Sequence, residues 1–211
     1  NGVGLGAAIT VNKIDSATSA RIGSGTGDRT QVLARTGDAT GTGLTVANGR
    51  LAGDVVLGDA VEIASYSGPD LKTLRAGATK QVTGVAVNAM STQHIENIDV
   101  TVGAGKVGLG AAVNVNLING SSVAEILNAD LNQTAGAANQ QVDVTAGNVA
   151  YGNGFVGNVT IGMGAAGAGV DTHVFGRTTR AGISNSAVDA QDRIAVDAES
   201  LQGASSLVIG A

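Results

Sequence analysis

The sequence predicts an all-β chain, a parallel β-solenoid (β-helix) built from imperfect repeats, on three observations. One stretch near the N-terminus recurs almost unchanged in the middle of the chain. Short runs of β-branched and apolar residues, each bounded by Gly, Asn or Asp, follow one another along most of the length. Small residues dominate the expected inward positions, as is typical where stacked coils bring backbones close together.

The recurring stretch is Val3–Ile14, which reads VGLGAAITVNKI, and its copy is Val107–Ile118, which reads VGLGAAVNVNLI. The match extends at the same offset, since Ala20–Ile22 corresponds to Ala124–Ile126. A looser third copy runs over Val170–Ile183, and its residues stand 57 positions after their counterparts in the second. Its correspondences include Val170 to Val113, Phe175 to Ile118 and His173 to Asn116. Self-similarity of this kind is the signature of repeat architectures.

The composition limits how a core can be built. The 211 residues include 33 Gly, one Pro, no Cys and no Trp. The aromatic residues are Tyr66, Tyr151, Phe155 and Phe175. A globular core takes much of its buried area from large aromatic side chains. A core of Val, Ile, Leu and Ala suits thin layers that stack closely.

Composition also argues against several classes of protein. The glycines keep no three-residue period and proline is nearly absent, which excludes collagen. The apolar content of 43% argues against disorder. The apolar runs are broken before the roughly 18 residues that a membrane-spanning helix needs. The net charge of −5 and the scattered Lys and Arg provide no basic stripe. We therefore expect neither a nucleic-acid partner nor a membrane span.

The first copy predicts two strands with a turn between them. Along Ala7–Asn12, Ala, Ile and Val alternate with Ala, Thr and Asn, which is the period of a strand with one buried face. Asp15–Thr18 has the composition of a turn, Ala20–Ile22 resumes the strand, and Gly23–Gly27 breaks it. Asn48-Gly49 and Asn119-Gly120 are placed for hairpin turns.

Further short strands follow, with a turn expected at Ser91–His94. They are expected at Gln31–Ala34, Gly43–Ala47, Asp54–Leu57, Ala60–Ser65, Gln81–Met90, Ile95–Val102, Gln141–Thr145, Phe155–Ile161, Val170–Phe175, Arg193–Val196 and Leu207–Ile209. Strands of this length predict coils of roughly 18–28 residues, about eight to eleven in all, each adding about 4.8 Å along the axis. Residues 1–211 are expected to form a single segment of a longer chain.

Two segments interrupt the pattern. Ser67–Lys80 contains Pro69 and predicts an irregular loop, with room for one helical turn at Asp70–Arg75. Asn128–Asn139 is polar and alanine-rich and predicts a surface excursion. Because loops on a rigid scaffold carry recognition, we expect any partner of this segment to bind there. Solvated loops without a partner are the alternative.

Sequence motifs for cofactors and catalysis are weak. Gly-x-Gly-x-x-Gly occurs at Gly103–Gly108, Gly152–Gly157 and Gly162–Gly167, but none of these opens a convincing helix, as a dinucleotide site requires. Either His94 or His173 could act as a general base. His173, however, aligns with Asn residues in the other copies, which favours a turn or stack position on one solenoid edge. We expect no cofactor and no catalytic residue.

The sequence patterns for metal binding and glycoside hydrolysis are also incomplete. Gly25–Asp28 and Thr36–Asp38 approach the calcium-binding β-roll pattern, but they lack its nine-residue repetition. Since calcium takes six or more oxygen ligands, ordinary turn aspartates are the preferred interpretation, and we expect no metal site. A pair of carboxylates for glycoside hydrolysis is the alternative function for the acidic residues. Four aromatic residues offer few platforms for sugar rings.

One family shares this style of repeat. Gly84–Met90 (GVAVNAM), then Ile95–Ile98, then the motif copy at 107–126 resemble the repeat region of very large bacterial surface exoproteins. These are the filamentous-haemagglutinin and leukotoxin-like adhesins, including autotransporter passengers. The resemblance covers most of the chain as a repeat style, from which Ser67–Lys80 and Gly162–Gly169 depart. It implies a β-solenoid stalk, export to the cell surface, and a role in adhesion or cell–cell aggregation. It offers no catalytic residues to carry over.

These features favour a structural stalk or adhesion segment of a secreted or cell-surface bacterial exoprotein, with an extracellular location. Its expected partners are a host or bacterial surface component, reached through loops or a distal region, and neighbouring solenoid segments of the same chain. A secreted polysaccharide-active enzyme on a β-helix scaffold is the alternative. A toxin passenger domain is a third hypothesis, for which no local feature argues.

Overall fold

The computed structural model describes residues 2–34, 43–51, 77–134 and 136–210. This part of the chain is all β and contains no helix. Its strands are β1 (Val3–Ile22), β2 (Thr30–Val32), β3 (Leu44–Leu51), β4 (Gly77–Val82), β5 (Gly84–Ala104), β6 (Val107–Leu127), β7 (Ala129–Leu131), β8 (Gln141–Ile161), β9 (Gly164–Ser184), β10 (Ala187–Val188) and β11 (Arg193–Gly210).

Three parallel sheets organise these strands. The first long sheet has the order β1-β6-β9, the second long sheet β11-β8-β5, and the short sheet β10-β7-β2. The chain therefore passes through the first long sheet, the short sheet and the second long sheet in that order, and does so three times. β3 and β4 form a separate antiparallel pair within the first pass.

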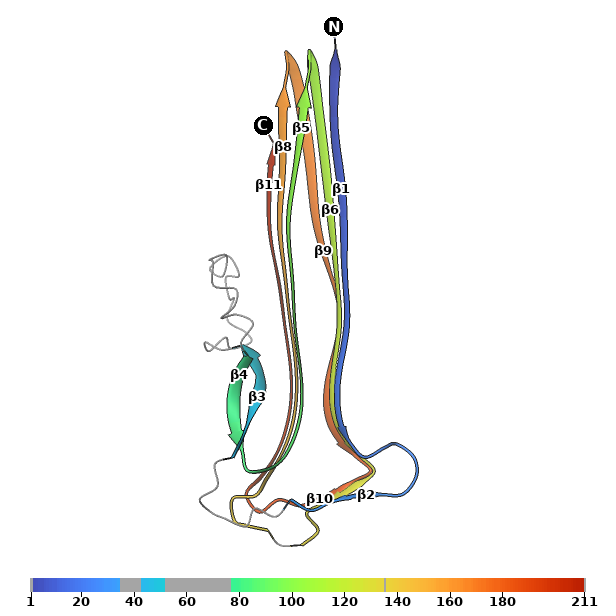
Figure 1. Cartoon of the computed structure of the whole chain (residues 1–211), viewed down its shortest axis with the longest axis vertical. Coiled ribbons are helices and arrows are strands. Elements are labelled where there is room, and N and C mark those ends of the chain that lie inside the picture. The colour runs from blue at the N-terminus through green and yellow to red at the C-terminus, as the bar shows by residue number, and fades with distance from the viewer. Residues whose placement is uncertain (1, 35–42, 52–76, 135, 211) are drawn as a thin grey trace.

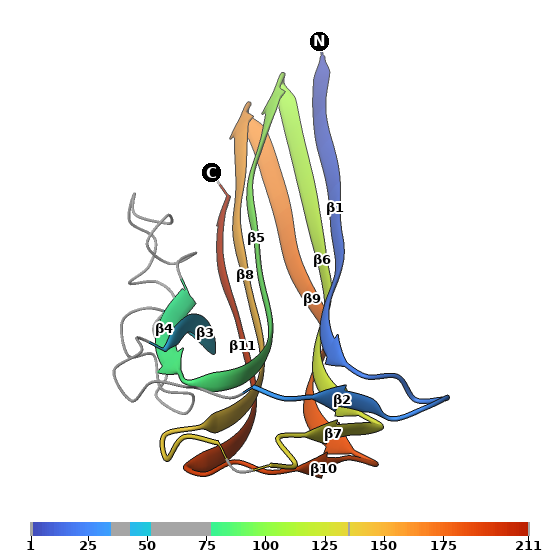
Figure 2. The ribbon, with the colours of Figure 1, turned by 60° about the horizontal axis from the view of Figure 1, so that its bottom comes forward.

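The two long sheets face each other and enclose a narrow interior. Figure 1 shows them close together at the end where the N-terminus lies and farther apart at the opposite end. The short sheet spans between them at that wider end, as Figure 2 shows more clearly. We call the narrow end, at Gly4 and Ala104, the apex, and the end at Leu131 the base.

Pairing between the motif copies is in register. Ile9 on β1 lies beside Val113 on β6, and Val113 lies beside Val170 on β9. The partners of β1 and β6 differ by 104 positions throughout, and those of β6 and β9 by 57. The predicted alignment of the three copies is therefore confirmed. The two offsets differ by 47 residues, because the first pass carries the segment that includes β3 and β4.

Several predicted turns are wrong. Asp15–Thr18 lies within β1, Ser91–His94 within β5, and Asn119-Gly120 within β6, so each predicted pair of strands is one long strand. The strands predicted at the two ends of β8 are likewise continuous, as are those of β11. The chain does not reverse at these points, because the inward residues Ser16, Ser91 and Gly120 fit a narrow interior. On the outer face, Asn119 bonds to Asp15 on the neighbouring strand.

The predicted coil length is also wrong. The pattern repeats after 57 residues, not after about 18–28, and the described chain makes three passes. In a sheet of three hydrogen-bonded strands, the outer two lie only about 10 Å apart. The described part is therefore much shorter along the stacking direction than a stack of eight to eleven coils would be. The predicted strands are too short, because polar residues within the long strands are of the same types as those that form turns.

Two predicted short strands are confirmed, since Gln31–Ala34 overlaps β2 and Gly43–Ala47 overlaps β3. The prediction of a surface excursion at Asn128–Asn139 is wrong for its first part. β7 forms there, with Leu131 fully buried in the base, because the short sheet needs an apolar residue between the long sheets. Gly77–Lys80 begins β4. The rest of the predicted loop Ser67–Lys80, with its helical turn at Asp70–Arg75, lies outside the described residues, as do the strands Asp54–Leu57 and Ala60–Ser65.

Exposure alternates strictly along β1 and identifies the inward face. Ala8, Thr10 and Asn12 face inward, whereas Ile9 is 77% exposed and Val11 62% exposed. The buried face of the alternating stretch is thus the one that carries Thr and Asn. Toward the apex the interior is therefore largely polar and the outer face apolar, although Val156 is buried inside and Ile95, Ile118 and Ala150 form one apolar layer beside the polar residues.

The interior becomes apolar toward the base, where all three sheets surround it. Ile126 of β6, Val144 of β8 and Leu131 of β7 are fully buried in one cluster. Burying an aliphatic side chain of this size contributes about 1.5–3 kcal/mol. The other buried members of the cluster are Val85, Val87, Ala89, Ala124, Ala129, Val142 and Ala146.

Glycine lets the two long sheets close at the apex. A Cβ atom on Gly6 would lie 2.6 Å from the carbonyl oxygen of Val102 on the opposite sheet, and one on Gly103 would lie 2.5 Å from that of Leu109. Neither approach is possible for a real side chain without moving a backbone. The predicted preference for small inward residues is confirmed at this end.

We predict that Ile126→Ala lowers the free energy of unfolding by about 2–5 kcal/mol, because it removes buried atoms from the base cluster and leaves a cavity. Val11→Ala is the matched control on an outward position, with an expected change within about 0.5 kcal/mol. Urea unfolding followed by circular dichroism measures both. Equal losses in the two variants would contradict the assignment of the inward face.

We also predict that the double variant Ile9→Cys, Val113→Cys forms a disulfide under mild oxidation. Neighbouring strands lie about 4.8 Å apart, which is within the Cα separation that a disulfide spans. The chain has no natural Cys, so the product is unambiguous on a non-reducing gel. Ile9→Cys, Leu117→Cys is the control, with its second Cys displaced by four residues or about 13 Å along the strand. A disulfide in the control alone would disprove the register.

Candidate functional site

Polar side chains fill the interior between the two long sheets. Asn12, Asn116 and His173 lie side by side across β1, β6 and β9, and the Asn12 amide donates to Asn116 Oδ1 at 3.2 Å. From the opposite sheet, Asn97 Nδ2 donates to Asn116 Oδ1 at 2.8 Å and to Asn114 Oδ1 at 2.6 Å. This polar row therefore connects strands within one sheet and connects the two sheets to each other.

His173 takes the place of Asn12 and Asn116, as its alignment predicts, but it lies in the interior rather than at a turn or edge. Its Nε2 is 3.0 Å from Asp171 Oδ2, and its Nδ1 is 3.4 Å from Asn116 Nδ2. A proton on Nε2 donates to the carboxylate and leaves Nδ1 to accept from the amide. The two side chains are 5% and 0% exposed, so this arrangement is closed to solvent.

A histidine held by an aspartate is also the base-and-orienting half of a catalytic triad. The third member, a nucleophile, is not bonded to the ring in the described part of the chain. Gly152 stands opposite, where a Cβ atom would lie 2.8 Å from His173 Cε1, so this glycine provides the space that the ring fills. In the described part of the chain, His173 and Asp171 therefore form a cross-link within the interior.

A second charged cluster lies on the outer face of the second long sheet. Lys80 Nζ on β4 is 2.7 Å from Asp143 Oδ2 and from Thr145 Oγ1, and 3.7 Å from Asp197 Oδ2. Thr145 Oγ1 donates to Asp143 Oδ1 at 2.7 Å. Since Asp143 is 1% exposed, the lysine offsets the free energy of burying its carboxylate and fastens β4 to the sheet. No sequence pattern indicated this cluster, because Lys80 stands at the end of a predicted loop.

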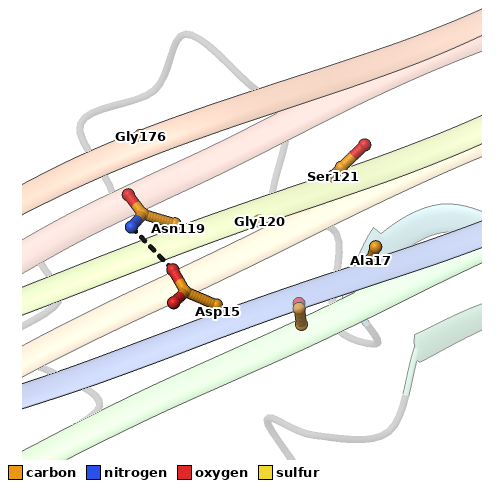
Figure 3. Close-up of a pocket in the computed structure, with 7 residues that line it drawn as sticks. Asp15, Ala17, Asn119, Gly120, Ser121 and Gly176 are labelled. Atoms are coloured by element: carbon orange, nitrogen blue, oxygen red, sulfur yellow. Dashed lines mark hydrogen bonds between the residues drawn. The ribbon is translucent and has the colours of Figure 1, made fainter.

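An open pocket of about 400 Å³ lies on the outer face of the first long sheet (Figure 3). Asn119 Nδ2 donates to Asp15 Oδ1 at 2.8 Å, and Lys13 Nζ is 2.7 Å from Asp15 Oδ2. Gly176 leaves space beside them, since a Cβ atom there would lie 2.5 Å from Asn119 Oδ1. The pocket thus offers a carboxylate, an amide and hydroxyl groups to a polar ligand. Its lining residues are Asp15, Ser16, Ala17, Asn119, Gly120, Ser121 and Gly176.

A further pocket of about 450 Å³ lies between the edge strands β1 and β5. Ser16 Oγ on β1 is 3.2 Å from Ser91 Oγ on β5, and Gln93 also bonds to Ser16. His94 lines the rim and points outward, where its Nε2 is 3.3 Å from Asn153 Nδ2. The structure therefore places His94 and His173 in different environments and does not bring them together.

The outer faces near the apex are apolar on both sheets. On the first long sheet, Val3 is 65% and Leu5 75% exposed, and on the second, Ile98 is 71% and Val102 59% exposed. Because the strands pair in register, these side chains continue as rows across neighbouring strands. Contiguous apolar surface of this kind marks sites of association in soluble proteins.

The remaining motifs lie at unremarkable places. Gly103–Gly108 and Gly162–Gly167 contain the apex turns, and Gly152–Gly157 lies within β8; no described helix follows any of them. Gly25–Asp28 lies between β1 and β2, and Thr36–Asp38 lies outside the described residues. Over the described ranges, no group of three or more His, Cys, Asp or Glu side chains is placed to hold a metal ion. Nor is there a helix of the length and hydropathy that crossing a membrane requires in these ranges.

Comparison with known proteins adds no relatives. No family model, no curated protein and no solved structure matches the chain.

We predict that Asn119→Ala raises the pKa of the Asp15 carboxyl. The hydrogen bond from Lys13 and then that from Asn119 hold this pKa below its ordinary value of 3.8. A depressed pKa means that the bonds stabilise the fold above the unfolded-state pKa, and that this contribution is lost as the pH falls through the folded-state value. A carbon-detected NMR titration of Asp15 measures the change. Ser121→Ala, which alters the same pocket without touching these bonds, should leave the pKa unchanged, and a rise in both variants would argue against the assigned bond.

Proposed function

We propose that this chain is a β-solenoid segment that serves as a structural stalk in a secreted or cell-surface bacterial exoprotein, where it supports attachment or cell–cell aggregation. The observation that carries the proposal is the threefold passage of the chain through the same three sheets, with the motif copies in register. A body built this way lengthens by adding passes, and its stability is approximately a sum of contributions from neighbouring passes. That property suits a spacer.

Interactions between successive passes support a mechanical role. Glu125 on β6 is 5% exposed and accepts from Arg21 on β1 at 2.8 Å and from Arg180 on β9 at 3.1 Å. One carboxylate thus joins all three passes. Paired in this way, the buried charge favours the stacked arrangement over a slipped one, in which it would lose both partners.

The apolar outer faces support a role in contact. Leu5 and Val102 lie on opposite sides of the thin apex and are both largely exposed. A second solenoid segment or a surface component of a cell could cover such faces, and either would remove apolar area from water at about 25 cal/mol per Å². The resemblance of Gly84–Met90 and the motif at 107–126 to large bacterial adhesins points to the same setting.

A polysaccharide-active enzyme on the same scaffold is the alternative. Asp143 and Asp197 flank Lys80 on the outer face of the second long sheet. They are the carboxylates that such an enzyme would use as acid and base. Lys80 fills the space between them, which favours a structural pairing over the acid and base roles that glycoside hydrolysis requires.

Display of the chain on a non-adherent bacterium, through an unrelated anchor, tests the proposal. We expect faster settling of the displaying cells and greater attachment to a surface. Leu5→Gln, Val102→Gln should weaken both effects while the circular dichroism spectrum of the purified variant stays unchanged. Ile126→Asp, which places a charge in the base cluster, is the unfolded control and should abolish them.

Two results together would overturn the stalk and favour the enzyme. One is the absence of settling and attachment with a well-displayed wild-type chain. The other is release of reducing ends from a polysaccharide by the purified chain, abolished by Asp197→Asn.

A further inference from the structure

One layer of the interior, between the polar row and the base, is polar but incompletely bonded. Gly120 on β6 leaves room for side chains of the opposite sheet, since a Cβ atom on it would lie 2.8 Å from Gln93 Nε2 and 3.1 Å from Asn148 Nδ2. Arg177 lies beside Gly120 on β9 and reaches across to the opposite sheet, where its Nη1 donates to Gln93 Oε1 at 3.1 Å. The side chains of Arg177, Gln93 and Asn148 therefore meet in front of this glycine, where Gln93 and Asn148 occupy the space that a side chain on it would take.

Several buried polar atoms around this meeting point have no hydrogen-bond partner in the described part of the chain. They include Nε and Nη2 of Arg177 and both amide atoms of Asn148. Ser122 Oγ and Thr179 Oγ1, on the paired positions two residues further along β6 and β9, are also unbonded. Asn148 and Ser122 are 0% exposed. An unsatisfied buried polar group costs about 1–3 kcal/mol, and native interiors rarely leave several together.

The two Arg177 nitrogens that have no described partner can donate to an anion in a defined geometry. Nη1 is occupied by Gln93, whereas Nε and Nη2 form the side edge of the guanidinium, with two N–H bonds pointing in nearly parallel directions. That edge matches two oxygens of one carboxylate, sulfate or phosphate group in a bidentate contact. Two water molecules would be needed to bond to both donors in the same parallel geometry.

The positive charge of Arg177 also favours an anionic ligand. Burial lowers the pKa of Arg177 to about 10, with no carboxylate to offset the effect, so the guanidinium remains charged at neutral pH. Among the described interior carboxylates, Asp171 is bonded to Asn114 and His173, and Asp99 accepts from Thr10 and lies six positions from Gln93, about 20 Å along β5. The positive charge between the sheets is therefore without a described counter-charge.

We propose that this layer is a binding site for a small oxyanion, held by the side edge of Arg177, with the Asn148 amide and the Ser122 and Thr179 hydroxyls as additional donors. The ligand class is a free planar carboxylate or a tetrahedral anion such as sulfate or phosphate. Binding joins the two long sheets at a level where their own side chains do not complete the contact.

The test follows the Arg177 Nε–H resonance in the ¹⁵N-labelled full chain by NMR during titration with sodium sulfate and with sodium acetate, at constant ionic strength held with sodium chloride. The resonance is assigned by its loss in Arg177→Lys. We expect a saturable shift that follows a single-site isotherm for either oxyanion. Arg180, on the outer face of the same strand, is the internal reference, and its resonance should not saturate.

A matched pair of variants gives an independent readout. Thermal unfolding of the wild type should shift upward with added oxyanion at constant ionic strength, and Arg180→Gln should retain this shift. Arg177→Gln should lose it. A shift of the Arg177 resonance that is linear, shared with Arg180, or reproduced by chloride alone would overturn the proposal, as would an oxyanion-dependent melting temperature that survives Arg177→Gln.

Discussion

In-register backbone pairing between parallel strands is the constraint on which the rest of this structure depends. The pairing of β1 with β6 continues without slip over all 20 residues of β1, and that of β6 with β9 is equally regular. Because side chains alternate between faces, a slip of one residue would exchange the inner and outer face of every strand. Asn12, Asn116 and His173 form one row only because the register holds from one end of the strands to the other.

Because the register holds along the strands, the chemistry of the interior differs between the base and the apex. At the base, Ile126 and Leu131 are fully buried, and the interior is that of an ordinary small hydrophobic core. Toward the apex the interior carries Asn, Thr and Gly, while residues such as Ile9 face solvent. Stability in this half comes from backbone ladders and amide hydrogen bonds more than from apolar burial. The exposed apolar rows are left for contact with other molecules.

The candidate sites follow from the same geometry. Two facing sheets that are close enough for Asn97 to reach Asn116 must either satisfy each interior polar group or leave room for something that does. His173 is satisfied by Asp171 and Asn116 and becomes a cross-link. Arg177 is satisfied at one nitrogen only, and its two remaining nitrogens carry the proposed oxyanion site. An interior side chain whose hydrogen bonds are all made thus acts as a cross-link, whereas one with unmade bonds can hold a ligand.

The sequence by itself determined the all-β class, the parallel correspondence of the motif copies and the alignment of His173 with Asn12 and Asn116. It could do so because parallel in-register pairing brings like residues together, so that repetition in the sequence is repetition in space. Only the tertiary structure decided that Asp15–Thr18 and Ser91–His94 continue their strands, that the Thr and Asn face is the inner one, and that Arg177 meets Gln93 and Asn148. Those outcomes depend on how far apart the two sheets stand, a distance set by side chains from separate passes that no single stretch of sequence contains.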